Sequence, residues 1–271
     1  MAAISRHGNR DWKGHHMYAF YKKIMTVLLV AICLPASAVA SMGLAKEDVQ
    51  TTNETVVILH GIGHSKWNMF VTEQALKHQG YKTLAISYPS LDHDIGTLAG
   101  LVHEKLTLSQ IWQQSTKVHF VTHSMGGLVT RRYLEDYKDK IPQDKLGRAG
   151  MMAPPHGGSE VADLLENLAP YKWVFGPAGQ ELTTETQSKN TIKPYYDVGI
   201  IAGSKGWPYF VADIVLPDAH DGRVAVEKTK WDGMTDHITM NATHSFISWK
   251  PNVHKQIVNF LQEGSFINEK Q

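Results

Sequence analysis

KVHFVTHSMGGLVT, residues 117–130, predicts a strand, a tight turn and a helix in immediate succession. It opens with apolar residues between Val118 and Val121, as a short buried strand does. Ser124 and two glycines follow, and apolar residues then recur at helical spacing as far as Leu134. A serine at such a turn is held in a sparsely populated backbone conformation that exposes its hydroxyl.

Two interpretations of this serine are open. In the first, Ser124 only caps the helix, and Gly126 and Gly127 only form a turn. In the second, Ser124 is the nucleophile of a G-x-S-x-G elbow, and the helix N-terminus offers N–H groups to a developing oxyanion. Thr122 stands where this motif has its first glycine, a mild departure at a crowded position. The rest of the chain must supply an acid and a histidine to favour the second.

The composition excludes several classes of protein. The 271 residues carry a net charge of +1 with 20% charged residues of both signs, so we expect no nucleic-acid partner. The fifteen histidines form no H-E-x-x-H motif, and the single cysteine excludes a C-x-x-C motif. We therefore expect no metal and no cofactor.

Residues 1–40 are predicted to be an N-terminal extension and a signal peptide. Lys22 and Lys23 precede a short apolar run, and small residues follow, with cleavage expected after Ala38 or Ala40. The protein is therefore expected to be exported, to the periplasm or outside the cell. An uncleaved N-terminal anchor is the alternative.

The true start of the chain, Met1 or Met17, stays open. The only cysteine, Cys33, lies inside the predicted signal peptide, so the processed chain would have no thiol. Its stability would then come from packing, without a disulfide.

Strands and helices are expected to alternate through residues 41–271, which predicts one α/β domain with a mostly parallel sheet and helices on both faces. The β-branched run at 56–59 has no polar alternation, which is typical of a strand buried on both faces. Residues 168–197 contain several prolines and glycines and are predicted to form a small cap or lid. The expected strands are 56–59, 83–86, 118–121, 149–155, 198–202 and 237–241, and the expected helices include 67–79, 92–114 and one from Pro251.

Further candidates for chemistry lie after the ends of predicted strands. The sequence His-Gly-Ile-Gly after the first strand is predicted to supply an oxyanion N–H from Ile62, beside the N–H of Met125. His244 follows the last strand and is the candidate base. Asp221 is the favoured acid because Gly222 allows a sharp turn, and Asp218 is the alternative.

The order Ser124, Asp221, His244, together with the glycine loop at Ile62, resembles the α/β-hydrolase fold family, in particular bacterial lipases and esterases. The resemblance covers about residues 55–265. It implies a Ser-His-Asp triad and an oxyanion hole made by the two N–H groups.

The function expected from this resemblance is hydrolysis of carboxylic esters through an acyl-enzyme. A thioesterase, an amidase or an acyltransferase would use the same triad, and a binding protein without turnover is a further alternative. Apolar and aromatic residues between 168 and 217 favour an acyl chain in the substrate. The expected partner is a small-molecule or lipid ester, with a membrane-surface contact as one option, and the oligomeric state stays open.

Overall fold

The structure is a computed structural model that describes residues 52–167, 169–209, 212–216 and 218–267. The chain divides into two units, Met1–Glu47 and Asp48–Gln271, and the described residues all belong to the second. The predicted extension and signal peptide lie outside them. Within the described ranges, no helix has the length and apolarity needed to cross a membrane.

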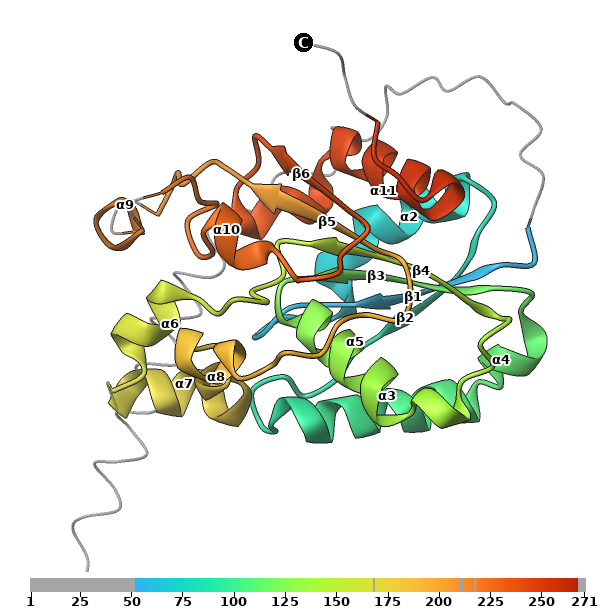
Figure 1. Cartoon of the computed structure of the whole chain (residues 1–271), viewed down its shortest axis with the longest axis horizontal. Coiled ribbons are helices and arrows are strands. Elements are labelled where there is room, and N and C mark those ends of the chain that lie inside the picture. The colour runs from blue at the N-terminus through green and yellow to red at the C-terminus, as the bar shows by residue number, and fades with distance from the viewer. Residues whose placement is uncertain (1–51, 168, 210–211, 217, 268–271) are drawn as a thin grey trace, which may run out of the picture. The chain divides into compact units, whose positions relative to one another are not determined.

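The second unit is built on a six-stranded sheet in which every neighbouring pair is parallel (Figure 1). The strand order is β2-β1-β3-β4-β5-β6, which confirms the predicted parallel sheet. The strands are β1 (Thr55–Leu59), β2 (Lys82–Ile86), β3 (Val118–His123), β4 (Leu146–Met152), β5 (Val198–Gly203) and β6 (Asp236–Met240).

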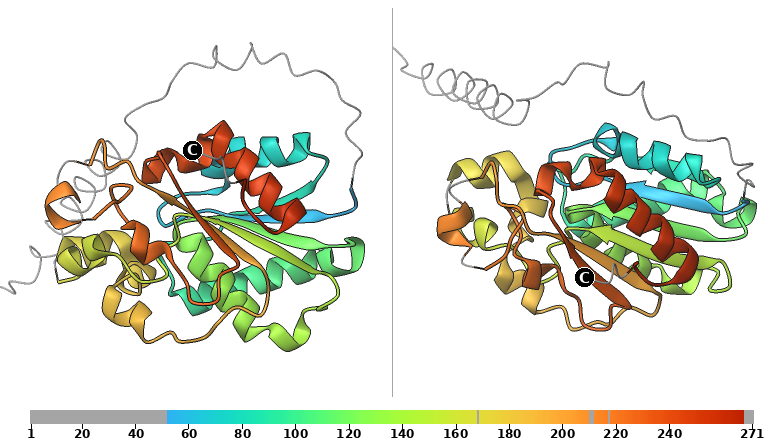
Figure 2. Two further views of the ribbon diagram at one scale, coloured as in Figure 1. Left: turned by 45° about the horizontal axis from the view of Figure 1, so that its top comes forward. Right: turned by 90° about the horizontal axis from the view of Figure 1, so that it is seen from above.

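Helices cover both faces of this sheet. Helices α2 (Phe70–His78) and α11 (Pro251–Glu263) lie on one face, and α3 (Ile95–Leu108) and α5 (Met125–Asp136) lie on the other (Figure 2). The remaining helices of the described part are η2 (Lys66–Met69), α4 (Ile111–Gln114), η3 (Lys138–Lys140), α6 (Glu160–Leu165), α7 (Ala169–Gln180), α8 (Thr184–Ser188), α9 (Ala212–Val215), α10 (Val226–Thr229) and η4 (His244–Trp249).

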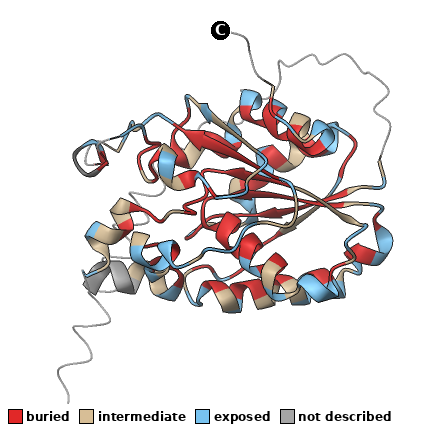
Figure 3. Cartoon of the chain, in the orientation of Figure 1, coloured by how far each residue is buried: buried red, intermediate tan, exposed pale blue. Residues whose placement is uncertain are grey.

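The central strands are buried at nearly every position, since helices cover both of their faces (Figure 3). Successive side chains of β1 point to opposite faces. Val57 and Leu59 pack in the cluster that contains α3 and α5, whereas Val56 and Ile58 pack in the cluster that contains α2 and α11. Each such buried side chain contributes about 1.5–3 kcal/mol relative to an exposed one.

Two predicted segments differ from the structure. The helix expected at 92–114 is broken into α3 and α4, because Gln110 adopts a left-handed conformation with φ 52°. Part of 168–197, predicted to be irregular, forms α7 and α8. Helix α7 is kinked at Gly176, where a Cβ would lie 1.8 Å from the carbonyl oxygen of Leu91. The absence of a side chain at Gly176 therefore lets α7 pack closely against Leu91.

Candidate active site

Ser124 occupies a strained turn between β3 and α5. Its backbone has φ 54° and ψ −128°, a conformation that residues other than glycine rarely adopt. The side chain makes no capping hydrogen bond to α5, so the interpretation as a helix cap is not supported. Gly126 is required nearby, because a Cβ there would lie 2.8 Å from the carbonyl oxygens of Leu59 and His60.

Thr122 fits inside the core at the place of the motif's first glycine. It is fully buried, and its hydroxyl has no hydrogen-bond partner among the described residues. A Cβ at Gly127 would lie 3.5 Å from that hydroxyl oxygen, which is ordinary contact. The threonine therefore does not prevent the close packing of β3 against α5.

A chain of hydrogen bonds joins Ser124 to His244 and Asp221. The Ser124 hydroxyl oxygen lies 2.9 Å from Nε2 of His244, and Nδ1 of His244 lies 2.7 Å from Oδ2 of Asp221. The three residues are 6%, 3% and 0% exposed, respectively. An imidazole between a hydroxyl and a carboxylate can remove the hydroxyl proton as the oxygen attacks.

The backbone of the 221–224 turn fixes the carboxylate of Asp221. Its Oδ1 accepts the N–H groups of Arg223 at 3.0 Å and Val224 at 2.9 Å, and Gly222 has φ 95°. The carbonyl of Asp221 also accepts the N–H of His244 at 2.9 Å. Asp218, the alternative acid, is exposed. The structure therefore brings Asp221 to His244, and Asp218 is not part of the chain of bonds.

The two predicted oxyanion donors come from separate segments on either side of Ser124. Met125 is the first residue of α5, and N–H groups in a first turn have no acceptor within the helix. In the described part of the chain, no acceptor is found for the N–H of Ile62 or of Met125. Gly61 brings the first segment close, since a Cβ there would lie 3.0 Å from Cβ of Ser124.

His60 and Tyr88 fix the orientation of the Gly61–Ile62 peptide. Nδ1 of His60 donates to the carbonyl of Gly61 at 2.8 Å, and its Nε2 accepts the N–H of Tyr88 at 3.3 Å. The Tyr88 hydroxyl donates to the carbonyl of His60, and the two rings stack at 4.2 Å. In a trans peptide the N–H points opposite to the carbonyl, so the Ile62 N–H points away from His60. Burial lowers the pKa of His60 to about 4, which keeps this ring neutral.

Sequence comparison identifies the family. The sequence model of the alpha/beta hydrolase family matches residues 56–251. The chain belongs to the alpha/beta hydrolase family. Its parallel sheet, with Ser124 at the turn after β3, is thus the sheet of an alpha/beta hydrolase. A comparison with curated protein sequences gave no match.

Solved structures of other alpha/beta hydrolases share the fold. Mature Bacillus licheniformis lipase BlEst2 has a TM-score of 0.60 and 22% identity over 74% of this chain and 88% of that chain. The metagenomic carboxyl esterase MGS0156 has a TM-score of 0.57 and 16% identity, covering 72% and 66% of the two chains. The type II thioesterase YbtT has a TM-score of 0.53 and 14% identity, covering 79% and 96%. Against the propeptide form of BlEst2, the alpha/beta hydrolase chain spans 53% of the length.

His123 supports the backbone of His244 in this alpha/beta hydrolase. Its Nε2 donates to the carbonyl of His244 at 2.9 Å, and the two rings lie 5.0 Å apart. Burial, followed by the charge of His244, lowers the pKa of His123 well below its ordinary value. His123 therefore stays neutral beside the nucleophile and adds no second positive charge there.

Three residues that the sequence did not single out connect the segments of the candidate acid and base. The hydroxyl of Tyr209 bonds to the hydroxyl of Ser245, the residue after His244. The guanidinium carbon of Arg223 lies 5.2 Å from the centre of the Tyr209 ring. The sequence could have indicated Arg223 and Ser245 only by their places in the chain, since Arg223 lies two residues after Asp221 and Ser245 directly follows His244.

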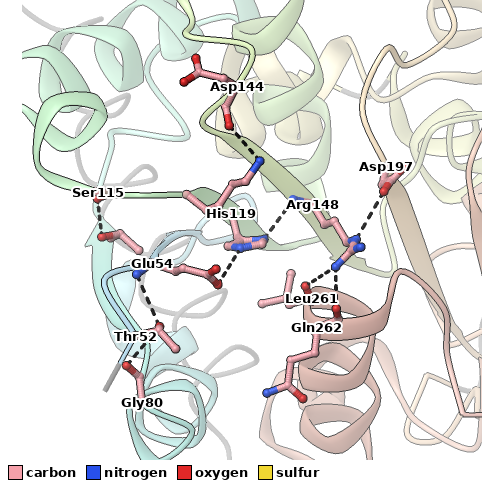
Figure 4. A network of polar contacts seen from close by, with 12 residues as sticks. Thr52, Glu54, Gly80, Ser115, His119, Asp144, Arg148, Asp197, Leu261 and Gln262 are labelled. Atoms are coloured by element: carbon pink, nitrogen blue, oxygen red, sulfur yellow. Dashed lines mark hydrogen bonds and ion pairs between the residues drawn. The ribbon is translucent and has the colours of Figure 1, made fainter. Parts of the chain in front are cut away.

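A cavity of about 560 Å³ lies at the opposite ends of the strands, lined by residues that include Glu54, His119 and Arg148. Glu54 binds His119 there, and Arg148 binds Asp197 (Figure 4). The Nζ of Lys117 donates to the carbonyl of Asp144 at 2.8 Å. Because Ser124 lies at the carboxyl end of β3, this cavity is separate from the candidate active site. The described His, Cys, Asp and Glu residues form no group of three or more that could hold a metal ion.

Proposed function

We propose that this alpha/beta hydrolase cleaves carboxylic esters through an acyl-enzyme on Ser124. The observation that carries the proposal is the buried chain of bonds from the Ser124 hydroxyl through His244 to Asp221. A serine hydroxyl is a weak nucleophile unless an adjacent base takes its proton. The fold alone would not support this proposal, since one fold serves many functions.

The proposed reaction has two halves. Ser124 attacks the ester carbonyl while Nε2 of His244 takes its proton, and the N–H groups of Ile62 and Met125 bind the resulting oxyanion. His244 then returns the proton to the leaving alcohol, which departs and leaves an acyl group on Ser124. Water, deprotonated by His244, attacks the acyl carbonyl. The bond to Ser124 then breaks, His244 returns the proton to the Ser124 oxygen, and the acid product leaves. Asp221 holds the ring of His244 and stabilises its positive charge in both halves.

The segment predicted as a cap supports an apolar acyl group as part of the substrate. A Cβ added at Gly179 of α7 would lie 3.5 Å from the Cδ1 of Ile62, so α7 packs against the proposed oxyanion loop.

The preferred acyl chain length and the type of bond cleaved would both be measured in one series of substrates, with matched oxygen esters and thioesters of increasing acyl length. Faster turnover of the thioesters at equal chain length would favour a thioesterase.

The direct test uses a fluorophosphonate probe, which reacts covalently with an activated serine. We expect the wild-type protein to be labelled and Ser124→Ala to remain unlabelled, with ester hydrolysis lost in the same variant. Equal labelling of the two proteins would overturn Ser124 as the nucleophile. Labelling without hydrolysis of any ester or thioester would instead favour a binding protein.

Export is part of the same proposal. It rests on the predicted signal peptide in residues 1–40. Fractionation of cells that express the full chain would test it, and the N-terminal sequence of the exported protein would locate the cleavage. Recovery of the uncleaved chain with membranes would favour the anchored alternative.

A further inference from the structure

Arg223 carries a positive charge close to the candidate active site and has no acidic partner there. It is half-buried and follows Asp221 by two positions. The arginine–carboxylate ion pairs of the described residues use Arg132 and Arg148, and none uses Arg223. A guanidinium presents a planar set of donors that matches carboxylate and phosphate oxygens. Its donors are therefore available to a ligand.

The backbone of Arg223 is fixed from both sides. Its N–H donates to Oδ1 of Asp221 at 3.0 Å, and its carbonyl accepts the hydroxyl of Ser159 at 2.7 Å. Ser159 also caps the first turn of α6. The residue thus projects from a turn that the candidate acid itself orders, so binding would require little reorganisation.

The side chain of Arg223 packs on the ring of Tyr209. Its guanidinium carbon is 5.2 Å from the centre of the Tyr209 ring. The hydroxyl of Tyr209 is bonded to Ser245, which adjoins His244 in sequence. Tyr209 therefore links the guanidinium to the residue that follows the candidate base in the chain.

Its charge also reaches the oxyanion side. Burial is the main cause of the lowered pKa values of His64 and His123, and the charge of Arg223 lowers both further. His64 belongs to the oxyanion loop, where its Nδ1 donates to the carbonyl of Ile62 at 2.8 Å. The charge of Arg223 thus acts on two histidines that adjoin the candidate site, His64 in the proposed oxyanion loop and His123 next to Ser124.

We propose that Arg223 binds an anionic group, a carboxylate or a phosphate, on the alcohol portion of the ester substrate. The proposal rests on the function proposed above. His244 must deliver a proton to the leaving oxygen, so the alcohol portion lies on the His244 side, where Arg223 projects. The apolar acyl portion lies towards Ile62 and α7. The preferred substrate is therefore an ester with an apolar acid and an anionic alcohol.

The test compares three butyryl esters whose alcohols differ mainly in charge. They are the esters of para-hydroxybenzamide, which is neutral, para-hydroxybenzoate and para-hydroxyphenyl phosphate. We expect Arg223→Gln to lower kcat/KM for an anionic ester by about 10- to 100-fold relative to the neutral one. Arg223→Lys should restore part of the difference, and added salt should weaken it in the wild type. The two anionic arms show whether carboxylate or phosphate is preferred.

Lys205→Gln is the matched control, because Lys205 is exposed and its Nζ lies 6.0 Å from the centre of the Trp207 ring. It should leave the ratio of anionic to neutral rates unchanged. An equal loss for all three esters in Arg223→Gln would mean a structural role and would overturn the proposal, as would no loss at all. Hydrolysis that survives Ser124→Ala would instead overturn the proposed function. The two failures are therefore distinguishable.

Discussion

The sheet carries a carboxylate–histidine pair at each end, and the two pairs differ in what binds the second ring nitrogen. At the carboxyl ends of the strands, Asp221 and His244 are 2.7 Å apart and the second nitrogen faces the Ser124 hydroxyl. At the amino ends, Glu54 and His119 are 3.3 Å apart (Figure 4). There the second nitrogen accepts the backbone N–H of Arg148 at 3.0 Å.

The difference shows that a carboxylate and a histidine do not by themselves make a base. A backbone amide cannot give up its proton under ordinary conditions, so Nδ1 of His119 is occupied as an acceptor within the sheet. A hydroxyl can lose its proton when its oxygen attacks an electrophile. We therefore expect His244 to serve catalysis and His119 to serve stability, and four measurements can test this difference.

The largest expected effect comes from replacing each histidine with glutamine. His244→Gln should lower kcat/KM for an ester by on the order of 10⁴–10⁶-fold, because the proton acceptor is lost. His119→Gln should leave kcat/KM within about twofold, since distant sites are usually independent. Steady-state kinetics on purified variants measure both.

The contrast would break if both variants lost activity to a similar degree while keeping their melting temperatures. His119→Gln should instead lower the free energy of unfolding by about 1–3 kcal/mol, because a buried polar contact is lost.

The next effect concerns the carboxylate at the active end. Asp221→Asn should lower kcat by about 10⁴-fold, because an amide no longer stabilises a positive His244 or selects its tautomer. Asp218→Asn is the matched control and should be nearly silent, since Asp218 is exposed and outside the chain of bonds. A greater loss in Asp218→Asn than in Asp221→Asn would reverse the assignment of the acid.

Acid should destabilise both ends of the sheet. Burial lowers the pKa of His60 from 6.5 to about 4 and also lowers that of His119. Below pH 6.5 the unfolded chain binds protons that the folded chain does not, so stability falls as the pH falls. His60 alone accounts for roughly 3 kcal/mol between pH 6.5 and 4.

Urea unfolding at several pH values across this window measures the slope, and His119→Gln should make it shallower than in the wild type. Stability that stays constant or rises on acidification would contradict the burial of neutral histidines.

The smallest effect is expected for the carboxylate at the amino ends. The side chain of Glu54 is 33% exposed, so water screens its pair with His119. Glu54→Gln should change the free energy of unfolding by about 0–1 kcal/mol and leave activity unchanged. Thermal and urea unfolding measure the first, and a loss above this range would mean that the pair contributes more than its exposure suggests.

The sequence was sufficient for the sheet and for the order of the candidate groups. Apolar runs such as 56–59 have few alternatives to a strand buried on both faces, and Ser124 adjoins glycines that mark its turn. Asp221 was favoured because of Gly222, and the structure gives Gly222 the positive φ of 95° that such a turn uses. These features are local, so they can be recognised from neighbouring residues.

Contacts between distant residues could not be predicted in this way. Tyr88 meets His60, and Tyr209 meets Ser245, only after the strands have paired and the loops have packed. Asp236 is a further case, since its Oδ2 accepts the N–H of Phe266 at 2.7 Å, a residue 30 positions later. The residues near Asp236 in the sequence do not predict that its carboxylate accepts this hydrogen bond.

Gly126 has a consequence for the dimensions of the site. The proposed oxyanion donors belong to two separate pieces of chain, so their spacing depends on how closely α5 approaches the end of β1. At Gly126 that approach is limited by the carbonyls of Leu59 and His60, with no room for a methyl group. The hydrogen atom that is the side chain of Gly126 thus sets how far apart the two proposed N–H donors lie. A larger residue at this position would change the distance between the two proposed N–H donors, although every reacting group would still be present.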